Sequence, residues 1–399
     1  MTRVLQGRCI ALGITGSIAA YKAADIASKL TQAGASVDVL MTEAAARFIT
    51  PLTLRSLTRR PVFLDMFDPN SELAEEHVEI ARRADAVLVA PASASTIARL
   101  AQGLADDVVS LTVLATQAPV LIAPAMDHQM FENAATQANL ETLRVRGYTI
   151  VGPAEGRLAS GRTGLGRLVE TEALLGALRS VLGRRGDLAG RRVVVSAGGT
   201  REPLDPVRFI TNYSTGKMGY ALAEAARDRG ADVTLVSTAA LPCPYGVRLV
   251  AVETVAEMRE AVLAACEGAD ALIMAAAVSD YRPAERASQK VKKGPERVSL
   301  ELERTPDFLL EVPGSMVKVG FAAETQDLLS NARAKLKAKG LDLIAANDVT
   351  APGSGFAVDT NQVTIIDASG GAEELPLLPK YDVAQRLLDR VAALLGQRR

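Results

Sequence analysis

A glycine-rich polar loop between a strand-like run and a helix-like run restricts the fold of the second half of the chain. Residues 193–196 are apolar and β-branched-rich, the polar loop covers 197–219, and residues 220–229 have helical spacing that ends at Gly230. Such a loop lies at the carboxyl end of a strand, where open α/β sheets bind ligands. Its paired glycines offer backbone N–H groups to a triphosphate or another anion. Its polar side chains include Arg201, Asn212, Ser214 and Lys217.

Strand-like runs alternate with helical patterns along both halves of the chain. The runs are 9–14, 37–42, 86–90 and 120–123 in the first half, and 193–197, 233–237, 271–276, 317–321 and 343–346 in the second, with a later strand at 363–367. This order predicts two α/β domains of the doubly wound, Rossmann-like kind, each with a parallel sheet. The short stretch 183–190 is polar and glycine-rich. The sequence therefore predicts a first domain over 1–183, a linker over 184–190 and a second domain over 191–399.

Charge and cysteine content favour small-molecule partners. The formal net charge is −1, which provides no broad attraction for nucleic acid or an anionic membrane. The three cysteines form no CxxC pair, as is typical of a reducing cytosol. The longest apolar region, 108–126, is broken by polar residues and two prolines, so no membrane span is expected. We expect a soluble, cytoplasmic protein.

The first half has a turn typical of phosphate binding. Gly16 lets the backbone close tightly after the first strand, and Thr15 and Ser17 place hydroxyls at a helix start. The turn is equally consistent with a tight connection alone. A dinucleotide site needs an acidic residue at the end of the second strand, but the two second strands end at Thr42 and Ser237. An NAD-dependent dehydrogenase is therefore the least favoured reading.

Two further segments with small polar residues follow strands in this half. They are 89–98 (VAPASASTIA) and 123–131 (APAMDHQMF), and His77 lies on a helix rich in glutamate. A histidine there is often only a solvated side chain. Together with residues 13–22, however, these segments resemble the FMN-dependent cysteine decarboxylase family over nearly all of residues 5–180.

The resemblance implies a flavodoxin-like FMN domain that oxidises a cysteinyl thiol to a thioaldehyde. The neighbouring carboxylate then leaves readily, and reduction of the resulting enethiol completes the cycle. By resemblance, His77 assists thiol oxidation, as suits an imidazole near neutral pH. The FMN-binding residues would be Thr15, Gly16, Ser17, Thr42, Pro91, Ser93, Ser95 and Thr96.

Three positions depart from the family pattern. Ser95 and Asp127 stand where the family has Asn, and Ser160 stands where the substrate lid has a cysteine. An ionised Asp127 would repel the substrate carboxylate unless burial kept it protonated. A serine hydroxyl is a far weaker acid than the lid thiol. We keep Asp127 and Ser160 as catalytic positions. One alternative is that the decarboxylase of this flavin domain is impaired or lost. The domain would then serve as a structural or assembly module fused to an active second half, which is identified below as a ligase. Water or another group could instead supply the proton.

The second half contains a phosphate cradle that is not a Walker P-loop, because Thr211 and Met218 occupy positions that need Gly and Ser/Thr. Asp280 follows a buried strand, a place where Asp is often a turn cap. Lysines 290, 292 and 293 form a cluster that is otherwise typical of solvated surface. Lys335 and Lys339 lie one helical turn apart, where they could simply favour the helix dipole.

In this order, from about 190 to 395, these motifs resemble the ligase domain of the bifunctional coenzyme A enzymes. The resemblance implies that CTP activates 4′-phosphopantothenate to an acyl-cytidylate, which the cysteine amine attacks. Asn212 would handle the acyl-cytidylate, with Mg²⁺ and lysines neutralising the pyrophosphate; no metal ligands are assigned. It also implies a homo-oligomer in which trimers of flavin domains are joined by ligase dimers. The CTP-binding residues would be Ala275, Ala276, Asp280, Lys290, Pro306, Asp307, Phe308, Leu309, Phe321, Lys335 and Lys339.

Overall fold

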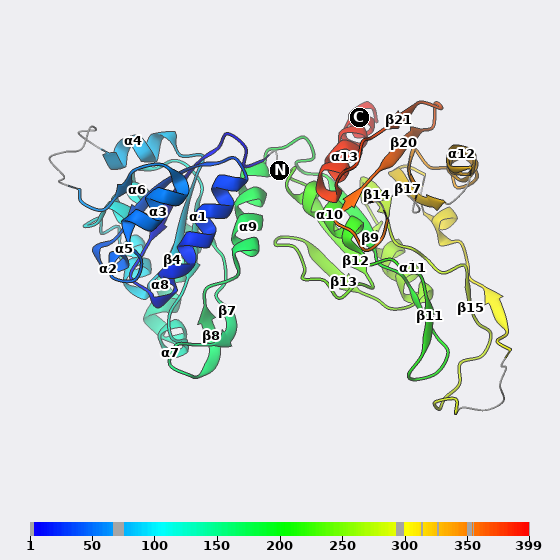
Figure 1. Ribbon diagram of the computed structural model, residues 1–399, viewed down its shortest axis with the longest axis horizontal. Coiled ribbons are helices and arrows are strands. Elements are labelled where there is room, and N and C mark those ends of the chain that lie inside the picture. Colours follow the sequence, from blue (N-terminus) through cyan, green and yellow to red (C-terminus); the bar gives the residue numbers. More distant parts are fainter. Residues whose placement is uncertain are drawn as a thin grey trace. The chain divides into compact units, whose positions relative to one another are not determined.

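The computed structural model describes residues 4–66, 76–292, 299–312, 314–324, 327–348, 353 and 355–398. The chain divides into two compact units, which we call unit 1 (Met1–Leu182) and unit 2 (Gly183–Arg399). Figure 1 shows a central sheet with helices packed around it in each unit. Each unit is described by itself below.

Unit 1 contains a six-stranded parallel sheet in the order β3-β2-β1-β4-β5-β6. The strands are β1 (Cys9–Ile14), β2 (Ser36–Met41), β3 (Val62–Phe63), β4 (Ala86–Ala92), β5 (Val120–Pro124) and β6 (Thr149–Ile150). Every residue of β4 is buried, as expected for a parallel sheet covered on both faces. The strand order reverses between β1 and β4, and ligands of such sheets bind at that point.

The sheet of unit 1 is surrounded by helices that connect successive strands. They are η1 (Ile18–Lys22), α1 (Ala23–Gln32), α2 (Glu43–Ala46), α3 (Pro51–Thr58), α4 (Glu76–Arg83), α5 (Ala94–Gln102), α6 (Val108–Ala115), α7 (His128–Glu132), α8 (Ala134–Val145) and α9 (Thr171–Gly183). A separate antiparallel hairpin, β7 (Ala154–Arg157) and β8 (Thr163–Arg167), occupies the predicted lid. We call residues 154–167 the lid hairpin.

Unit 2 contains an eight-stranded sheet in the order β13-β12-β9-β14-β17-β18-β20-β21. The strands are β9 (Arg192–Ala197), β12 (Asp232–Ser237), β13 (Arg248–Ala251), β14 (Ala271–Met274), β17 (Val317–Glu324), β18 (Leu343–Asp348), β20 (Val363–Asp367) and β21 (Ala372–Glu374). The pairs from β13 to β18 are parallel, whereas β20 and β21 are antiparallel. The predicted α/β class with two doubly wound sheets is confirmed.

Two helical layers cover the sheet of unit 2, and alternation along each strand determines what each layer contacts. Val193 and Val195 pack with α10 (Lys217–Arg227) and α13 (Lys380–Gln397) in one core. Val194 packs in the other core with α11 (Val255–Ala265). The helices η2 (Phe308–Glu311) and α12 (Leu328–Ala338) belong to this second face. Successive side chains of a strand point to opposite faces, so a run of valines supplies both cores.

The long loop after β9 contains a short hairpin that the sequence did not predict. Its strands are β10 (Arg201–Pro203) and β11 (Phe209–Thr211), and the nearby pair β15 (Tyr281–Pro283) and β16 (Leu302–Arg304) contacts it. The Asp205 carboxylate organises the turn, because it accepts the N–H groups of Val207 and Arg208 at 2.8 and 2.9 Å. The Arg208 guanidinium beside it lowers the pKa of Asp205 well below its usual range.

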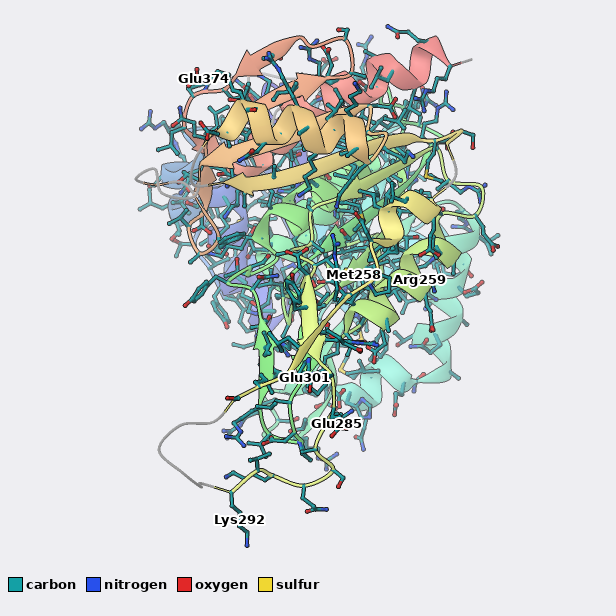
Figure 2. The ribbon with its side chains drawn as sticks, turned by 90° about the vertical axis from the view of Figure 1, so that its right-hand side faces the viewer. Met258, Arg259, Glu285, Lys292, Glu301 and Glu374 are labelled. Carbon is teal, nitrogen blue, oxygen red and sulfur yellow. The ribbon has the colours of Figure 1, made fainter. Side chains whose placement is uncertain are left out.

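We call residues 201–211, 281–292 and 299–304 the arm. Figure 2 shows the arm extending away from the sheet, with Glu301 nearer the body of the unit and Glu285 and Lys292 toward the far end. The remaining short strands of unit 2 are β19 (Thr360–Asn361) and β22 (Leu378–Pro379), which pair with each other.

The glycine-rich stretch 183–190 lies within unit 2. Leu188 is fully buried, and its N–H donates to the Arg229 carbonyl. The Arg229 guanidinium pairs with Asp187 and with Asp389 of α13. This segment is therefore fastened to the helical layer of unit 2.

Candidate functional site

In unit 1 the loops after β1 and β4 are tied together at the point where the strand order reverses. Thr15 is fully buried, and its hydroxyl donates to the Pro91 carbonyl at 2.7 Å. The Thr15 hydroxyl oxygen also accepts the Ser93 N–H at 2.9 Å. Gly16 is required here, because a Cβ would lie 2.6 Å from the Cβ of Ala44. The turn after β1 can therefore pack against α2 only with glycine at this position.

The serines predicted to bind phosphate begin helices at this edge. The Ser17 hydroxyl caps η1 and donates to the Ala125 carbonyl at 3.1 Å. The Ser93 hydroxyl caps α5 by accepting the Thr96 N–H at 3.3 Å. Thr42 caps α2 in the same way. These hydroxyls are already hydrogen-bonded within the protein, where they cap the first turns of the helices. The backbone N–H groups that they leave uncapped are available to an anion.

This edge has the donor set that the phosphate of a flavin mononucleotide needs. The capped start of α5 and the turn at Gly16 meet beside β1 and β4. The residue after β2 is Thr42 rather than an acid, and Glu43, the first residue of α2, is exposed and pairs with Arg47. A ribose-binding acid is expected only where an adenosine is held. The residues present therefore fit a mononucleotide better than a dinucleotide.

The other predicted residues of this half are more scattered. Ser95 is exposed in the first turn of α5, whereas Pro91 is buried at the end of β4. His77 lies half-buried on α4. No hydrogen bond between described residues joins His77 to Thr15 or Ser93. The structure thus brings Thr15, Gly16, Ser17, Pro91, Ser93 and Thr96 together, but it does not connect His77 to them.

Asp127 and Ser160, the two departures considered separately in the sequence, form one pair. The Ser160 hydroxyl donates to the Asp127 Oδ2 at 2.7 Å, and the Gln129 N–H donates to Oδ1 at 3.1 Å. The hydrogen bond from Ser160, followed by that from Gln129, lowers the pKa of Asp127. Burial does not keep Asp127 protonated, so it is an ionised carboxylate at neutral pH.

The base of the lid hairpin is fixed to the start of α7 by close backbone contacts. The Met126 N–H donates to the Gly166 carbonyl at 2.9 Å, and His128 Nδ1 lies 3.2 Å from the Leu165 carbonyl, which can only accept. A Cβ at Gly166 would lie 2.2 Å from the Met126 carbonyl oxygen, and one at Gly164 would collide with the His128 ring. The Ser160–Asp127 bond therefore fastens the tip of a hairpin whose base is already held.

In unit 2 a cavity of about 550 Å³ lies at the carboxyl ends of the central strands. The sheet order reverses between β9 and β14, and the loops after both strands line the cavity. It brings together the following predicted residues: Asn212, Ala275, Ala276, Asp280, Pro306, Asp307, Phe308, Leu309, Phe321, Lys335 and Lys339. Lys290 is exposed on the arm and does not line the cavity. Lys293 lies outside the described residues.

The loop after β9 is held against the loop after β14 by short polar contacts. The Asn212 side-chain amide donates to the Ala277 carbonyl at 3.1 Å, and a parallel bridge joins Gly199 to Ala277. The Thr200 hydroxyl accepts the Ser279 N–H at 2.9 Å. These contacts place Asn212 and Asp280 on the same side of the cavity.

The lysines of α12 have defined partners. Lys335 Nζ donates to the Phe321 carbonyl at 3.0 Å, and Lys339 Nζ lies 3.0 Å from the Asp307 carboxylate. Phe308, next to Asp307, is buried in the core and so holds η2 in place. Both ammonium groups therefore remain at the cavity wall.

Positive charge predominates among the cavity-lining side chains. The cations are Lys217, Arg304, Lys335, Lys339 and Lys380, and the acids are Asp280 and Asp307. A concave site with this balance attracts polyphosphates. The sequence reasoning did not single out Lys380, Asn347 or Asn361, which also line the cavity, because only the tertiary fold brings these distant segments together.

Within the described parts of the chain, no helix is both long enough and apolar enough to cross a membrane. Three or more His, Cys, Asp or Glu side chains do not gather into a metal site among those same residues.

Family models match nearly the whole chain. Residues 2–183 match the family described as Flavoprotein, and residues 188–395 match the DNA/pantothenate metabolism flavoprotein C-terminal domain. The coenzyme A biosynthesis bifunctional protein CoaBC of Bacillus subtilis (strain 168) is 46% identical over 401 residues, covering 99% of each chain.

Solved structures similar to each unit were also found. The C-terminal domain of a coenzyme A biosynthesis bifunctional protein CoaBC is 40% identical, covers 53% of this chain and 99% of its own, and gives a TM-score of 0.45. The FMN-dependent cysteine decarboxylase SpaF is 29% identical, covers 45% of this chain and 97% of its own, and gives a TM-score of 0.39.

Proposed function

We propose that the two sheet edges described above carry out two reactions, because this chain belongs to the family of coenzyme A biosynthesis bifunctional proteins. It is a phosphopantothenate–cysteine ligase joined to a phosphopantothenoylcysteine decarboxylase. We assign the flavin domain to residues 1–183 and the ligase domain to 191–399, with the connecting residues 184–190 packed against the ligase domain. Its substrates are small molecules. The full-length match to bifunctional relatives does not favour the alternative of a lost decarboxylase.

The ligase reaction is assigned to the cavity of unit 2, and the cationic lining of that cavity is the observation that carries the assignment. A carboxylate has no leaving group of its own, so 4′-phosphopantothenate attacks CTP, releases pyrophosphate and forms an acyl-cytidylate. The cysteine amine then attacks the acyl carbon and displaces CMP. Lys335 and Lys339 hold the nucleotide phosphates, and Asp280 meets the ribose or the cation. Asn212, fixed by Ala277, lies beside the acyl group.

Mg²⁺ is assigned to the bound nucleotide rather than to a preformed cage. The described residues contain no cluster of three metal-binding side chains. Mg²⁺ is commonly held by one or two carboxylates together with substrate phosphates. Asp280, which is exposed and lines the cavity, is the carboxylate placed for this role.

The decarboxylation is assigned to the carboxyl edge of unit 1, with FMN as the flavin. When bound, FMN supplies the two-electron oxidation and reduction of the substrate. The start of α5 and the Gly16 turn hold its phosphate, and Thr42 and Ser95 border it. His77 takes the thiol proton. Ser160 and Asp127 fasten the lid hairpin beside the substrate. Because an ionised Asp127 has no proton to donate, water or another group supplies the last proton.

We also propose a homo-oligomer in which ligase domains pair through the arm and flavin domains form trimers. The arm exposes large apolar side chains that a monomer would leave in water, namely Val207, Phe209, Leu300 and Leu302. Unit 1 exposes Ile18, Tyr21, Phe48 and Leu52. Pairing of arms would also bring Lys290 of one copy to the nucleotide of another.

The ligase assignment is tested by a matched pair of lysine variants on α12. Lys335→Met removes the ammonium at the cavity wall, whereas Lys337→Met removes an exposed one on the same helix. We expect Lys335→Met to raise the KM for CTP about tenfold or more and Lys337→Met to leave it unchanged, measured as pyrophosphate release with 4′-phosphopantothenate and cysteine. Equal effects of the two changes would refute the assignment.

A further inference from the structure

Residues 355–359 form a strap over the start of α10 in unit 2. The Thr215 hydroxyl donates to the Phe356 carbonyl at 2.6 Å. Lys217, the first residue of α10, donates from Nζ to the Ala357 carbonyl at 2.9 Å and to Asp359 Oδ1 at 2.7 Å. The strap is therefore attached to the helix end that lines the nucleotide cavity.

A second ammonium holds the strap from the opposite side. Lys380 begins α13, is 5% exposed, and donates from Nζ to the carbonyls of Gly355 at 2.9 Å and Phe356 at 3.3 Å, and to that of Val358. Burial, followed by repulsion from Lys217, lowers the pKa of Lys380 to about 8. The carbonyl groups of the strap thus converge on two neighbouring cations.

The two ammonium groups differ in how firmly they are held. Lys380 is enclosed by carbonyl groups, and moving it would leave a buried cation without partners. The carboxylate partner of Lys217 is Asp359, whose side chain is 88% exposed. Exposed ion pairs are weak because water screens them, so Lys217 can exchange its carboxylate for another anion at little cost.

The position of Lys217 favours such an exchange. It lies at the amino-terminal end of an 11-residue helix, where N–H groups and the helix dipole attract anions. It also lines the cavity that contains Lys335 and Lys339. A polyphosphate in that cavity carries more negative charge than one carboxylate, so it attracts the Lys217 ammonium more strongly than Asp359 does.

We propose that Asp359 holds the Lys217 ammonium in the nucleotide-free enzyme and gives it up to phosphate oxygens when the nucleotide binds, while Lys380 keeps the strap in place. This inference rests on the proposed nucleotide site. Asp359 is thus a positioning residue that competes with the substrate for a cation. No bond is made or broken in the exchange; one ion pair replaces another.

If Asp359 competes with the nucleotide, removing its carboxylate strengthens CTP binding. If Asp359 supported the site, the same change would weaken CTP binding. Nucleotide binds the state in which Lys217 is released from Asp359. When such a binding-competent state is only partly populated, the apparent affinity is reduced by the fraction populated. Removing the carboxylate charge therefore strengthens nucleotide binding. From the usual strength of exposed ion pairs, Asp359→Asn should lower the Kd for CTP by about two- to fivefold. Lys217→Met should raise it.

The test is calorimetric titration of the full chain with CTP and Mg²⁺. The variants are Asp359→Asn, Lys217→Met and the double variant, and the control is Asp232→Asn, an exposed aspartate at the opposite edge of the sheet. We expect tighter binding only for Asp359→Asn, and no effect of that change when Lys217 is already Met.

Two results would overturn the inference, and they can be told apart. Weaker or unchanged CTP binding by Asp359→Asn, with normal binding by the unchanged chain, would show that Asp359 supports or ignores the site. Failure of the unchanged chain to bind CTP would refute the nucleotide site itself, and the strap inference with it. Titration with pyrophosphate in place of CTP should give the same order of affinities, because the exchange involves phosphate oxygens alone.

Discussion

Gly219 is where the packing of unit 2 most directly controls the ligase site. It is the third residue of α10 and is buried against β9. A Cβ at this position would lie 2.5 Å from the Cβ of Ala197, 2.8 Å from the Ser196 carbonyl oxygen and 3.0 Å from the Ala197 Cα. Two of these contacts are with backbone, which cannot rotate away. Gly219→Ala therefore has to push the start of α10 off the sheet.

The size of the effect follows from these distances. Carbon atoms pack best at about 3.5–4.0 Å, so the helix start must move by about 1 Å. Overpacking of this kind costs about 1–3 kcal/mol, while alanine regains about 1 kcal/mol of helix propensity. The net loss of stability is modest. A misplacement of about 1 Å in a positioned site, however, can cost about 100-fold in rate, and Lys217 is two residues away.

The two units supply the assay and its internal control. We expect Gly219→Ala to lower the ligase rate about 10- to 100-fold and to leave flavin content and decarboxylation unchanged, measured on the same purified sample. The matched control is Gly396→Ala near the end of α13, because nothing lies within 4 Å of its added Cβ. A ligase rate for Gly219→Ala within about twofold of the unchanged chain would refute the reasoning that helix position controls the site.

Three further predictions concern other parts of the molecule. Gly16→Ala places a Cβ 2.6 Å from Ala44, so the purified protein should lose most of its flavin absorbance while ligation continues. Ser160→Ala or Asp127→Ala removes the bond at the lid tip, so trypsin should cut at the lid arginines several-fold faster. Because the pKa of Lys380 is lowered to about 8, the unfolded chain binds more protons above that pH, so the stability contributed by this site should rise between about pH 8 and 10.5.

Two of these predictions have a control variant, and the third has a result that would contradict it. Ser56→Ala changes an exposed serine on α3, outside the lid hairpin, and should leave the trypsin pattern unchanged. Lys380→Met should abolish the additional stability gained above pH 8, as seen in denaturant unfolding of unit 2; an equal pH response in that variant would contradict the assignment. Flavin retention by Gly16→Ala would show that the turn after β1 tolerates a side chain and does not form the cofactor edge as described.

Much of the fold could be predicted because the strands of parallel sheets are short apolar runs. Residues 193–195 supply both cores of unit 2, so their composition alone marks a buried strand. Helix limits were harder to predict. The apolar spacing indicated a helix from residue 220, whereas α10 begins at Lys217, because Gly216 adopts a φ of 82° and the helix begins at the next residue. The hairpin at 201–211 was missed since it depends on the hydrogen bonds of one carboxylate, Asp205.

The candidate sites were only partly accessible from the sequence. Motifs at strand ends indicated the residues around Ala275 and Lys335, because the carboxyl ends of parallel strands share one edge. The Ser160–Asp127 pair joins residues far apart in the chain. Both depart from the family pattern, but no local sequence pattern shows that Ser160 in the lid hairpin contacts Asp127 at the start of α7. Lys380 is likewise the first residue of the last helix, and only packing brings it to Lys217 and the strap.

The most direct test of the account is whether the full chain, with Ser160 and Asp127 in its lid, completes both reactions. The purified protein is incubated anaerobically with 4′-phosphopantothenate, cysteine, CTP and Mg²⁺, and the products are identified by mass. We predict accumulation of 4′-phosphopantetheine and release of CO₂ and pyrophosphate. Accumulation of 4′-phosphopantothenoylcysteine, or of its unreduced enethiol product, would contradict the account and show that the flavin domain does not complete its reaction.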